Sequence, residues 1–438
     1  MSKKTENSAY IRLFATAAFT PLAMAFVEKA AVGLKLGQAE AMSLTLATEE
    51  IFSYLCRIAT SDQPVEIHCS SGGYYVRADF LFPSDDFNMR AFNLTATVSF
   101  DDEASLEEMG LLIASRAVER FYISEEKGKR LKLSLIKEKA YPETITAEIP
   151  EVKPFRDFSI RRPDSDALKL FALLVKHHYE GQIIPCSFNY PGKVADMVDG
   201  GEYQAVLAIS PGGEVGGGII WRWAGLKTME CFGPYTFNQA PDSPMSNNLL
   251  DACLGYIART HAVGLINRFP TNDLPVKYFE TLGALTIFGS REQSSSVTAY
   301  FRQMQEDAGT SVWSSPELEQ FLQGEYGRLF LPRKILPVMD HGEMKAPFSV
   351  LSAEFDRSQD MVTLRAIRAG TDAYRNLSGH LSLFSRESIH NVFFEMDLGL
   401  PWQAEFTPAL LKSAFKPMLV LPYAGQGDII VFQLFRKL

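Results

Sequence analysis

Residues 228–304 include the runs TMECFGPYTF (228–237) and SNNLLDACLGYIART (246–260), and this stretch decides the fold of the 438-residue chain. The first run predicts a strand with a Gly-Pro bend, and the second predicts an amphipathic helix behind a Ser/Asn cap. The rest predicts short elements in this order: a strand at 264–269, a helix at 274–282 that ends at Gly283, and strands at 285–288 and 296–302. The alternation of strands and helices predicts an α/β domain.

A similar order of elements returns between residues 348 and 435. We expect strands at 348–355 and 361–367, a helix at 371–384 capped by Thr371/Asp372, a strand at 391–396, a helix at 408–415, and strands at 418–421 and 428–435. Because only the order of elements is shared, we interpret this region as an internal duplication or a paired half-domain.

The N-terminal part has a different pattern. We expect helices at 10–31 and 37–58, a hairpin at 64–82, a helix at 105–121 opened by a Ser105/Glu108 capping box, and a hairpin at 121–135. Helices on one face of a mostly antiparallel sheet form an α+β sandwich. The whole chain is therefore predicted to be a multidomain α+β and α/β protein.

We predict five segments: a first domain at 1–142, a Pro-bearing linker at 143–157, a domain at 158–304, a bridging segment at 305–347 and a C-terminal half-domain at 348–438. Within the bridge, Arg333 and Lys334 could attract an anion, with simple solvation of the two charges as the alternative. The boundaries follow changes in composition and in the pattern of elements.

Composition excludes several classes of protein. A net charge of -9 argues against a dedicated nucleic-acid binder, which needs a basic face. The five cysteines form no CxxC pair, so we expect neither a zinc site nor a disulfide framework, and a reducing cytoplasm fits best. No segment reaches the roughly 18 uninterrupted apolar residues that a membrane span requires. We predict a soluble cytoplasmic protein without a metal site.

LTLATEEIFSYL (44–55) and MGLLIASRAVERFYI (109–123) resemble the histidine-kinase-like (GHKL) ATP-binding domains, in particular the anti-sigma-factor kinases. The resemblance covers roughly the first 140 residues and implies an α/β sandwich that binds ATP or ADP and contacts a protein partner. It places Glu50 at the catalytic Glu position and makes Asp86, Gly110 and Leu111 candidate nucleotide-binding residues. The position four residues after Glu50 is Tyr54, where the family has a magnesium-binding Asn, so nucleotide binding would be weak or independent of magnesium.

LAISPGGEVGGGIIW (207–221) and YFETLGALTIF (278–288) are similar to segments of GNAT acyltransferases. This resemblance covers roughly residues 158–304 and implies a mixed sheet that binds acyl-CoA at a helix N-terminus. It makes Glu230 the candidate general base. The position of the family's proton-donating Tyr is Phe279, and the family's Arg/Gln-x-x-Gly-x-Gly/Ala phosphate motif is missing at 232–249.

Polar and aromatic residues gather in two C-terminal segments, 394–403 and 422–429. Loops at strand ends are favoured ligand sites in open sheets. We therefore predict a small-ligand pocket, with packing of the same side chains as the alternative. Its candidate residues are Glu395, Asp397, Trp402, Tyr423 and Asp428.

Three functions remain open. We favour a regulatory or ligand-sensing protein, in which an ATP-binding-like module is joined to a region that binds acyl-CoA or another small ligand. The alternative is an active acyl-CoA-dependent N-acyltransferase with Glu230 as base. The third is an anti-sigma-type serine kinase, which the Tyr54 substitution counts against.

Overall fold

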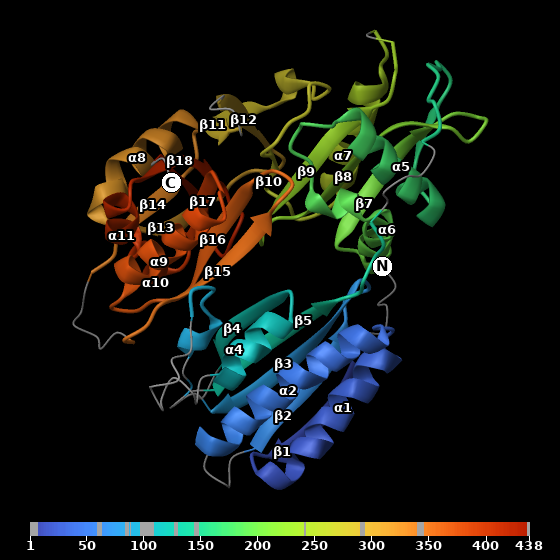
Figure 1. Cartoon of the computed structure of the whole chain (residues 1–438). Coiled ribbons are helices and arrows are strands. Elements are labelled where there is room, and N and C mark those ends of the chain that lie inside the picture. Colours follow the sequence, from blue (N-terminus) through green and yellow to red (C-terminus); the bar gives the residue numbers. More distant parts are fainter. Residues whose placement is uncertain are drawn as a thin grey trace. The chain divides into compact units, whose positions relative to one another are not determined.

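The computed structural model in Figure 1 describes residues 8–58, 64–83, 87, 89–96, 109–126, 130–143, 149–240, 242–289, 294–339 and 346–435. The chain forms two compact units, Met1–Tyr141 and Pro142–Leu438. Each unit has its own sheets and its own buried core, so each is described by itself.

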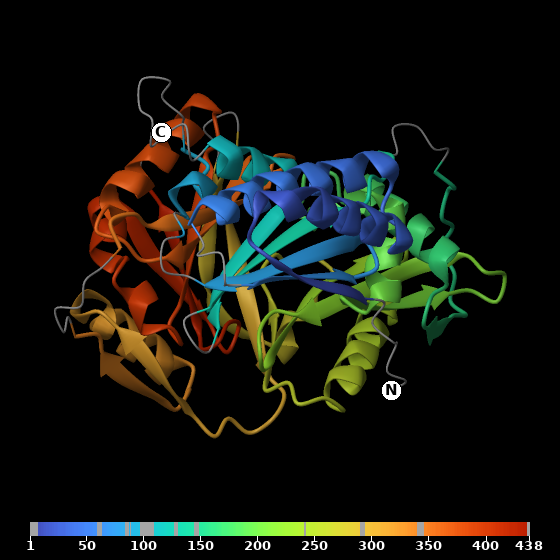
Figure 2. The same ribbon diagram turned by 90° about the horizontal axis from the view of Figure 1, so that it is seen from below.

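The first unit is one antiparallel sheet covered by helices on one face, as Figure 2 shows. The strands follow the order β1 (Ser8–Phe14), β2 (Pro64–Ser71), β3 (Tyr75–Pro83), β5 (Arg130–Glu138) and β4 (Arg120–Glu126). The helices are α1 (Thr20–Gly33), α2 (Gln38–Ile58) and α4 (Met109–Ala117). Both predicted hairpins form, with β2 pairing β3 and β4 pairing β5.

The predicted helix at 10–31 is wrong in its first part. Residues 8–14 form β1, where Leu13 is buried while Tyr10 and Phe14 on the other side are exposed. Neighbouring residues of a strand point to opposite faces, so this alternation suits a strand better than a helix. Helix α1 begins only at Thr20, with Pro21 in its first turn, where a missing N–H costs nothing.

The predicted helix at 105–121 ends earlier in the structure. Helix α4 runs from Met109 to Ala117, and Arg120 already belongs to β4. The capping-box residues Ser105 and Glu108 lie outside the described residues. The aromatic and β-branched residues 121–123 pair with β5 and so extend the strand toward the helix.

The second unit contains a seven-stranded sheet in the order β11-β12-β10-β9-β8-β7-β6. Strands β9 and β10 are parallel, and every other neighbouring pair is antiparallel. The strands are β6 (Ser159–Arg161), β7 (Tyr203–Ile209), β8 (Val215–Trp223), β9 (Thr228–Thr236), β10 (Gly264–Asn267), β11 (Glu280–Phe288) and β12 (Ser294–Gln303).

Three helices cover this sheet: α5 (Ser165–His178), α6 (Pro191–Gly200) and α7 (Met245–Ile257). A side chain at Gly217 would meet Met245 of α7, and one at Gly218 would meet Phe171 of α5. Successive strand residues face opposite sides, so α5 and α7 lie on opposite faces of the sheet.

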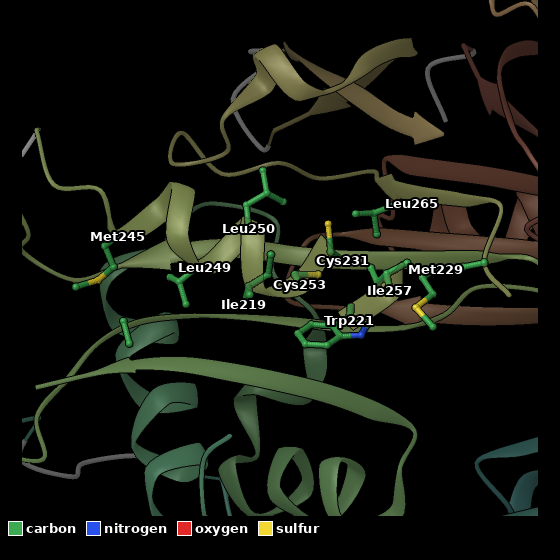
Figure 3. Close-up of a cluster of buried hydrophobic side chains, with 12 residues drawn as sticks. Ile219, Trp221, Met229, Cys231, Met245, Leu249, Leu250, Cys253, Ile257 and Leu265 are labelled. Atoms are coloured by element: carbon green, nitrogen blue, oxygen red, sulfur yellow. The ribbon is translucent and has the colours of Figure 1, made fainter. Parts of the chain in front are cut away.

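The core beneath α7 explains why residues 228–260 fold as predicted. Trp221, Met229 and Cys231 point from β8 and β9 toward α7, as Figure 3 shows. Leu249, Leu250, Cys253 and Ile257 of α7 meet them, and all are almost completely buried. Burying one such side chain contributes roughly 1.5–3 kcal/mol.

The predicted helix at 274–282 is wrong. Only Val276–Tyr278 make a short 3₁₀ turn (η4), and β11 begins at Glu280 and pairs with β12. Gly283 is part of a bulge in β11 and has a φ of 148°, which favours glycine. A Cβ there would come within 2.9 Å of the Met418 carbonyl oxygen, so close packing against another strand requires this glycine.

The rest of the second unit is a smaller two-stranded sheet and a five-stranded sheet. The former pairs β13 (Thr310–Ser314) with β14 (Arg333–Pro337), joined by α8 (Pro316–Arg328). The latter has the order β15 (Val350–Asp356), β16 (Met361–Arg368), β17 (Asn391–Asp397), β19 (Ile429–Leu434) and β18 (Phe415–Leu421). Its helices are α9 (Ala373–Arg386), α10 (Pro401–Ala404) and α11 (Thr407–Lys412).

The five-stranded sheet repeats the order and directions of β8 to β12. Strands β16 and β17 are the parallel pair, with α9 between them, as β9 and β10 are with α7. The predicted helix at 408–415 ends earlier, at Lys412, because Phe415 already starts β18. The chain is thus a mixed α/β protein with several sheets. None of the helices in the described ranges is long and apolar enough for a membrane span.

Candidate functional site

Glu230 lies in the middle of the second unit, on β9, and is completely buried with two arginines. The register of β8 and β9 places Arg222 opposite Glu230, and its Nη2 donates to the Glu230 carboxylate at 3.1 Å. Arg268, just after β10, donates from Nη2 to the same carboxylate at 3.1 Å. Glu230 therefore has two cationic partners from two different strand regions.

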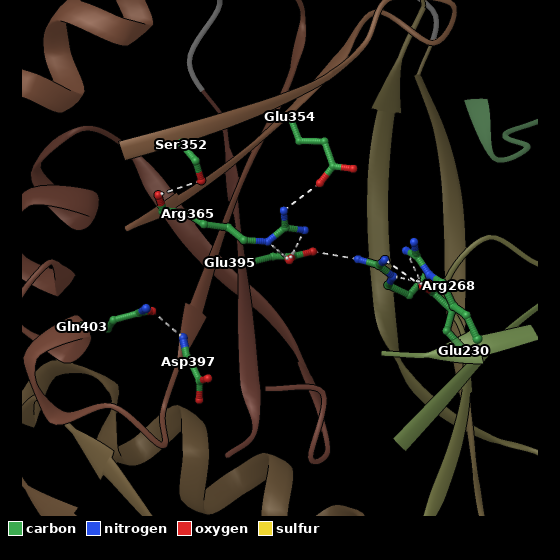
Figure 4. A network of polar contacts seen from close by, with 9 residues as sticks. Glu230, Arg268, Ser352, Glu354, Arg365, Glu395, Asp397 and Gln403 are labelled. Atoms are coloured by element: carbon green, nitrogen blue, oxygen red, sulfur yellow. Dashed lines mark hydrogen bonds and ion pairs between the residues drawn. The ribbon is translucent and has the colours of Figure 1, made fainter. Parts of the chain in front are cut away.

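These contacts continue into the five-stranded sheet as a chain of alternating charges, shown in Figure 4. Arg268 Nη1 donates to Glu395 on β17 at 2.7 Å, and Arg365 Nε on β16 donates to Glu395 at 2.7 Å. Arg365 Nη1 then donates to Glu354 on β15 at 2.7 Å. We call the five residues Glu230, Arg268, Glu395, Arg365 and Glu354 the ion-pair chain.

The ion-pair chain runs from the interior to the surface. The side chain of Glu230 is 1% exposed, whereas those of Arg365 and Glu354 are 40% and 66% exposed. A buried carboxylate that loses its cation leaves an uncompensated charge, which costs far more than breaking an exposed pair. The Glu230 end therefore matters for stability, and the Glu354 end is accessible to solvent.

The two buried carboxylates of the ion-pair chain, Glu230 and Glu395, are poor proton acceptors near neutral pH. Burial by itself would raise the pKa of Glu230, but Arg268 and Arg222 outweigh it and lower that pKa below the usual range. In the same way, Arg365 and Arg268 overcome burial and lower the pKa of Glu395 to about 2. A general base works best with a pKa near the working pH. The catalytic role of Glu230 stays a prediction, and its surroundings favour an ion pair.

Strands β9 and β10 separate directly after Glu230, and side chains of the second unit fill the opening between them. Pairing of β9 with β10 ends at Glu230 and Ile266. Beyond it, Asn267 Nδ2 donates to the Gly233 carbonyl oxygen at 2.9 Å, and Thr271 Oγ1 donates to that of Pro234 at 2.6 Å. The N–H of Thr236, at the end of β9, donates to the Tyr179 hydroxyl at 2.7 Å. The backbone of β9 at this opening is thus already hydrogen-bonded within the chain.

The start of α7, where the resemblance to acyltransferases places acyl-CoA, is covered by residues 149–155. Asn238 Nδ2 donates to the Val152 carbonyl oxygen at 3.3 Å, and the Phe155 N–H donates to Gln239 Oε1 at 3.3 Å. The Phe155 ring occupies the space where Gly216 lacks a side chain, 2.4 Å from an ideal Cβ. Phe155 and Met245 therefore fill the space beside Gly216 at the start of α7.

The five predicted C-terminal ligand residues lie in four separate settings. Glu395 belongs to the ion-pair chain. The Asp397 carboxylate accepts the N–H groups of Gly399, Gln426 and Gly427 at 2.9, 2.7 and 3.0 Å, and so holds the turn before β19. Trp402 is half-buried in α10. A ligand-binding role for these residues stays a prediction.

Asp428 and Tyr423 belong to a buried cluster around Arg333. Arg333 donates to Asp428 and to Asp307, each at 2.7 Å, and its side chain is 0% exposed. The Tyr423 hydroxyl donates to Asp307 at 2.6 Å, and its ring lies 4.3 Å from the guanidinium carbon. The prediction that Arg333 attracts an anion is wrong, because Asp307 and Asp428 already neutralise its charge.

A cavity of about 410 Å³ lies elsewhere in the five-stranded sheet, between the β16–α9 turn and α11. We call it the α9 pocket. Its lining combines small and apolar side chains with two hydroxyls, one ammonium and one carboxylate group. The lining residues are Ala369, Gly370, Thr371, Ala373, Tyr374, Glu405, Phe406, Pro408, Ala409 and Lys412.

The start of α9 is left without a side-chain cap in the described structure. The predicted cap Asp372 turns away, and its Oδ1 accepts the N–H and the hydroxyl of Ser349 at 2.6 and 2.8 Å. The first N–H groups of a helix normally need an acceptor, which a ligand anion can supply. Sequence reasoning missed this pocket because Asp372 looked like an ordinary cap, although the Gly370-Thr371 turn after a strand was a usable signal.

The opening between β16 and β17 is bridged by a glutamine. Pairing ends at Arg365 and Glu395. Gln403 of α10 then donates to the Ala366 carbonyl oxygen at 3.2 Å and accepts the Asp397 N–H at 2.7 Å. The amide therefore continues the hydrogen bonding of the parallel pair where the backbone no longer can.

In the first unit, the candidate nucleotide residues face one another across α2 and α4. A Cβ at Gly110 would lie 2.4 Å from Glu50 Oε2, so the carboxylate packs directly on this glycine. Partial burial, and then the neighbouring Glu49, raise the pKa of Glu50. Leu111 is buried in the core, and Asp86 lies outside the described residues.

Aromatic rings fill the space beside Glu50. Tyr54 and Phe87 meet edge to face with ring centres 5.5 Å apart, and Phe87 also contacts Phe82 at 4.9 Å. Tyr54 and Phe87 are both buried. A phenol cannot replace an amide as a compact magnesium ligand. These residues do not fit ATP with magnesium.

Comparisons with known proteins find similar solved structures, all at low identity and low TM-score. No protein-family description matches the chain. No curated protein matches it either. Among solved structures, similar ones include the RsbU and RsbW domains of a Mycobacterium tuberculosis protein, with 15% identity, coverage of 31% of this chain and 33% of that chain, and a TM-score of 0.23. The present chain thus spans about a third of that protein.

Two GNAT structures are also similar. One is a phosphinothricin acetyltransferase from Sinorhizobium meliloti in complex with AcCoA, at 15% identity over 33% of this chain and 88% of that one, with a TM-score of 0.28. The other is an Escherichia coli N-acetyltransferase in complex with CoA, at 12% identity over 36% and 88%, with a TM-score of 0.26. Similarities this low carry no functional argument for the chain.

Proposed function

We propose that residues 142–438 form a small-ligand-binding module and that the protein is regulatory or ligand-sensing. The observation that carries this proposal is the α9 pocket. Its volume of about 410 Å³ lies within the range of about 300–1,000 Å³ that is typical of small-molecule sites. It also lies beside the start of a helix that follows a parallel strand, which is a favoured place for ligands.

The lining defines the kind of ligand. The uncapped first turn of α9 and the Lys412 ammonium attract an anionic group, and Thr371 adds a hydroxyl. Phe406, Pro408 and the alanines supply an apolar wall for the rest of the molecule. A CoA thioester or free CoA has both features and is the ligand class that the acyltransferase resemblance implies.

The experiment is a thermal unfolding panel with free CoA, acetyl-CoA, ADP and ATP with and without magnesium. All four tryptophans, at positions 221, 223, 313 and 402, lie in the second unit, so their fluorescence reports this unit alone. A ligand at 100 times its dissociation constant adds about 2.7 kcal/mol of stability, which raises the melting temperature by degrees. We expect a shift with CoA species.

The matched variants are Lys412→Glu and Lys416→Glu. Lys412 lines the α9 pocket, whereas Lys416 is an exposed lysine on β18 over the Phe435 ring. We expect Lys412→Glu to remove most of the CoA-induced shift and Lys416→Glu to retain it. An equal shift in both variants, or no shift with any CoA species, would contradict the proposal.

The same samples separate the proposal from the N-acyltransferase alternative with Glu230 as base. Transfer of an acyl group to an amine breaks the thioester and releases one free thiol per turnover. Thiol release from acetyl-CoA in the presence of small amines that E230Q abolishes would favour the enzyme. Binding without thiol release favours the sensing module.

We further propose that the first unit has retained protein binding rather than kinase chemistry. The support is that Tyr54 and Phe87 fill the region beside Glu50, while several apolar side chains on its helices remain exposed. Incorporation of labelled phosphate from ATP into a serine-containing partner or into the chain itself would contradict this.

A further inference from the structure

A cavity on the helices of the first unit has no part in the function proposed above. Helices α2 and α4 pack against each other on one face of the sheet, as Figure 1 shows. The groove between them has a volume of about 470 Å³, within the range of about 300–1,000 Å³ that is typical of small-molecule sites. We call it the α2–α4 groove. Its lining residues are Leu46, Leu112, Ile113, Arg116 and Ala117.

The walls of the α2–α4 groove are apolar side chains that remain partly in water. Leu46 of α2 is 42% exposed, and Ile113 of α4 is 36% exposed. Residues four apart lie on the same face of a helix, so Met42 continues the wall from Leu46, and Met109 continues it from Ile113. Both methionines are exposed as well. A ligand with an apolar body therefore covers surface here that the first unit leaves in contact with water.

Arg116 is the charged residue among those that line the α2–α4 groove. Its Nη2 donates to the Leu94 carbonyl oxygen at 2.5 Å, and no ion pair joins it to a carboxylate in the described part of the chain. Partial burial lowers the pKa of Arg116, and no nearby acid opposes this effect. Burial alone would also lower the pKa of Arg268 and Arg365, but their carboxylate partners raise it. Arg116 therefore has guanidinium N–H groups left for an anionic ligand.

The two ends of the α2–α4 groove carry opposite charges. The Glu50 carboxylate packs on Gly110, in the first turn of α4, and the neighbouring Glu49 adds a second negative charge. Arg116 lies in the last turn of α4, about 9 Å further along the helix axis. A ligand with one anionic end is therefore held with that end at Arg116. A second anionic group at the far end would be repelled by the two glutamates.

We propose that the α2–α4 groove binds a single-chain carboxylate amphiphile, such as a medium-chain fatty acid. The ligand carboxylate accepts hydrogen bonds from Arg116, and the acyl chain lies along Leu46, Leu112 and Ile113. Charge favours a free amphiphile over a lipid surface, because Glu49, Glu50 and the net charge of -9 repel the other headgroups of an anionic membrane. This ligand and this site are separate from CoA and the α9 pocket.

The first test is calorimetric titration of the full chain with sodium decanoate below the concentration at which it forms micelles. We expect one saturable site per chain. In the series octanoate, decanoate and dodecanoate, affinity should rise roughly twofold to fourfold per methylene, according to how much of each methylene is buried. Decanol lacks the carboxylate, and decanedioate carries a second one at the glutamate end. Each should bind about tenfold more weakly than decanoate, or worse.

A second test assigns the site to its residues. Arg116→Gln should weaken decanoate binding about tenfold, because the charge-assisted hydrogen bonds are lost. The matched control is Arg57→Gln, which removes an exposed arginine from the last turn of α2, outside the lining of the groove, and should retain the affinity. Leu46→Asp should abolish binding. Lys412→Glu, the variant that tests CoA binding at the α9 pocket, should bind decanoate like the wild type. Circular dichroism checks that each variant is folded.

Four results would overturn the inference. One is the absence of saturable binding for every acid of the series. Another is equal affinity for decanol and decanoate, because the arginine would then have no role. The third is loss of decanoate binding in Lys412→Glu but not in Arg116→Gln, which would place the site in the second unit. The last is binding to phosphatidylglycerol vesicles without binding to free decanoate, which would assign the groove to a membrane surface.

Discussion

The seven-stranded and five-stranded sheets of the second unit share one topology, but the space where their parallel strands separate is filled differently in each. In both, a parallel strand pair separates after a charged residue, and a helix begins beyond the first strand of the pair. In the seven-stranded sheet, residues 149–155 and the segment from Asn267 to Asp273 fill the region beyond the pair. In the five-stranded sheet, Gln403 bridges the strands and the α9 pocket remains.

The difference shows that the same topology serves as a scaffold in one copy and as a candidate ligand site in the other. The ion-pair chain joins the two, with its buried end on the seven-stranded sheet and its exposed end on the five-stranded sheet. Function cannot be transferred from a fold to a chain without the side chains that occupy its site.

The largest expected effect separates the two ends of the ion-pair chain. Glu230→Gln should lower the free energy of unfolding of the second unit by about 3–5 kcal/mol, because it leaves Arg222 and Arg268 without their shared buried counter-ion. Glu354→Gln, at the 66% exposed end, should cost about 0–1 kcal/mol. Urea titration followed by tryptophan fluorescence measures both. An equal loss of stability in the two variants would mean that the two ends of the ion-pair chain do not differ in burial in solution.

The next effect concerns acid. In the folded protein the pKa of Glu395 is about 2, below the usual value of 4.5. The ion pairs of Glu395 with Arg365 and Arg268 therefore stabilise the second unit fully above pH 4.5, and this stabilisation decreases as the pH falls toward 2. The shift corresponds to about 3 kcal/mol.

Glu395→Gln removes this dependence. The wild type should therefore be much more stable than Glu395→Gln at pH 6, and the gap should narrow by pH 3. Urea unfolding at the two pH values checks it. A gap that is constant or widens with acid would contradict the assigned pKa direction.

A smaller effect is expected for the side-chain amides of Asn267 and Gln403, each of which bridges the opening beyond a parallel strand pair. Asn267→Ala and Gln403→Ala each leave a buried backbone carbonyl without its donor, so each should cost about 1–3 kcal/mol of stability. Of the two, Gln403 is the one close in sequence to the α9 pocket, because it precedes the lining residue Glu405 by two positions. CoA-induced stabilisation should therefore weaken in Gln403→Ala and persist in Asn267→Ala. If both variants lose it, or neither does, the two openings are not functionally different.

Prediction from sequence worked where local pattern and core packing agree. The helix at 246–260 is confirmed as α7, because its apolar face meets Trp221 and Met229 beneath it. The helix at 10–31 was wrong in its first part, where β1 pairs with β2 some fifty residues later. The helix at 274–282 was wrong because β11 pairs with the following strand β12. Strand pairing overrides local propensity in both cases.

The candidate site followed the same division. Glu230 was predicted as a general base and Glu395 as a ligand residue, and both roles stay predictions; the sequence separates Glu395 from Arg268 by 127 positions. Their pairing, and the low pKa that follows from it, depend on how two sheets pack. Asp397, Asp428 and Tyr423 were predicted as ligand groups, and nothing local shows that Asp397 holds a turn or that Asp428 neutralises Arg333.

By itself, the sequence determined the alternation of elements, the repeated β–α–β order and the absence of a fitting magnesium ligand at Tyr54, because these depend on neighbours along the chain. Only the tertiary structure decided which openings are filled, which carboxylates are neutralised and where a pocket remains. Those properties depend on side chains brought together from distant positions, and the buried charges among them are stable only when their partners arrive.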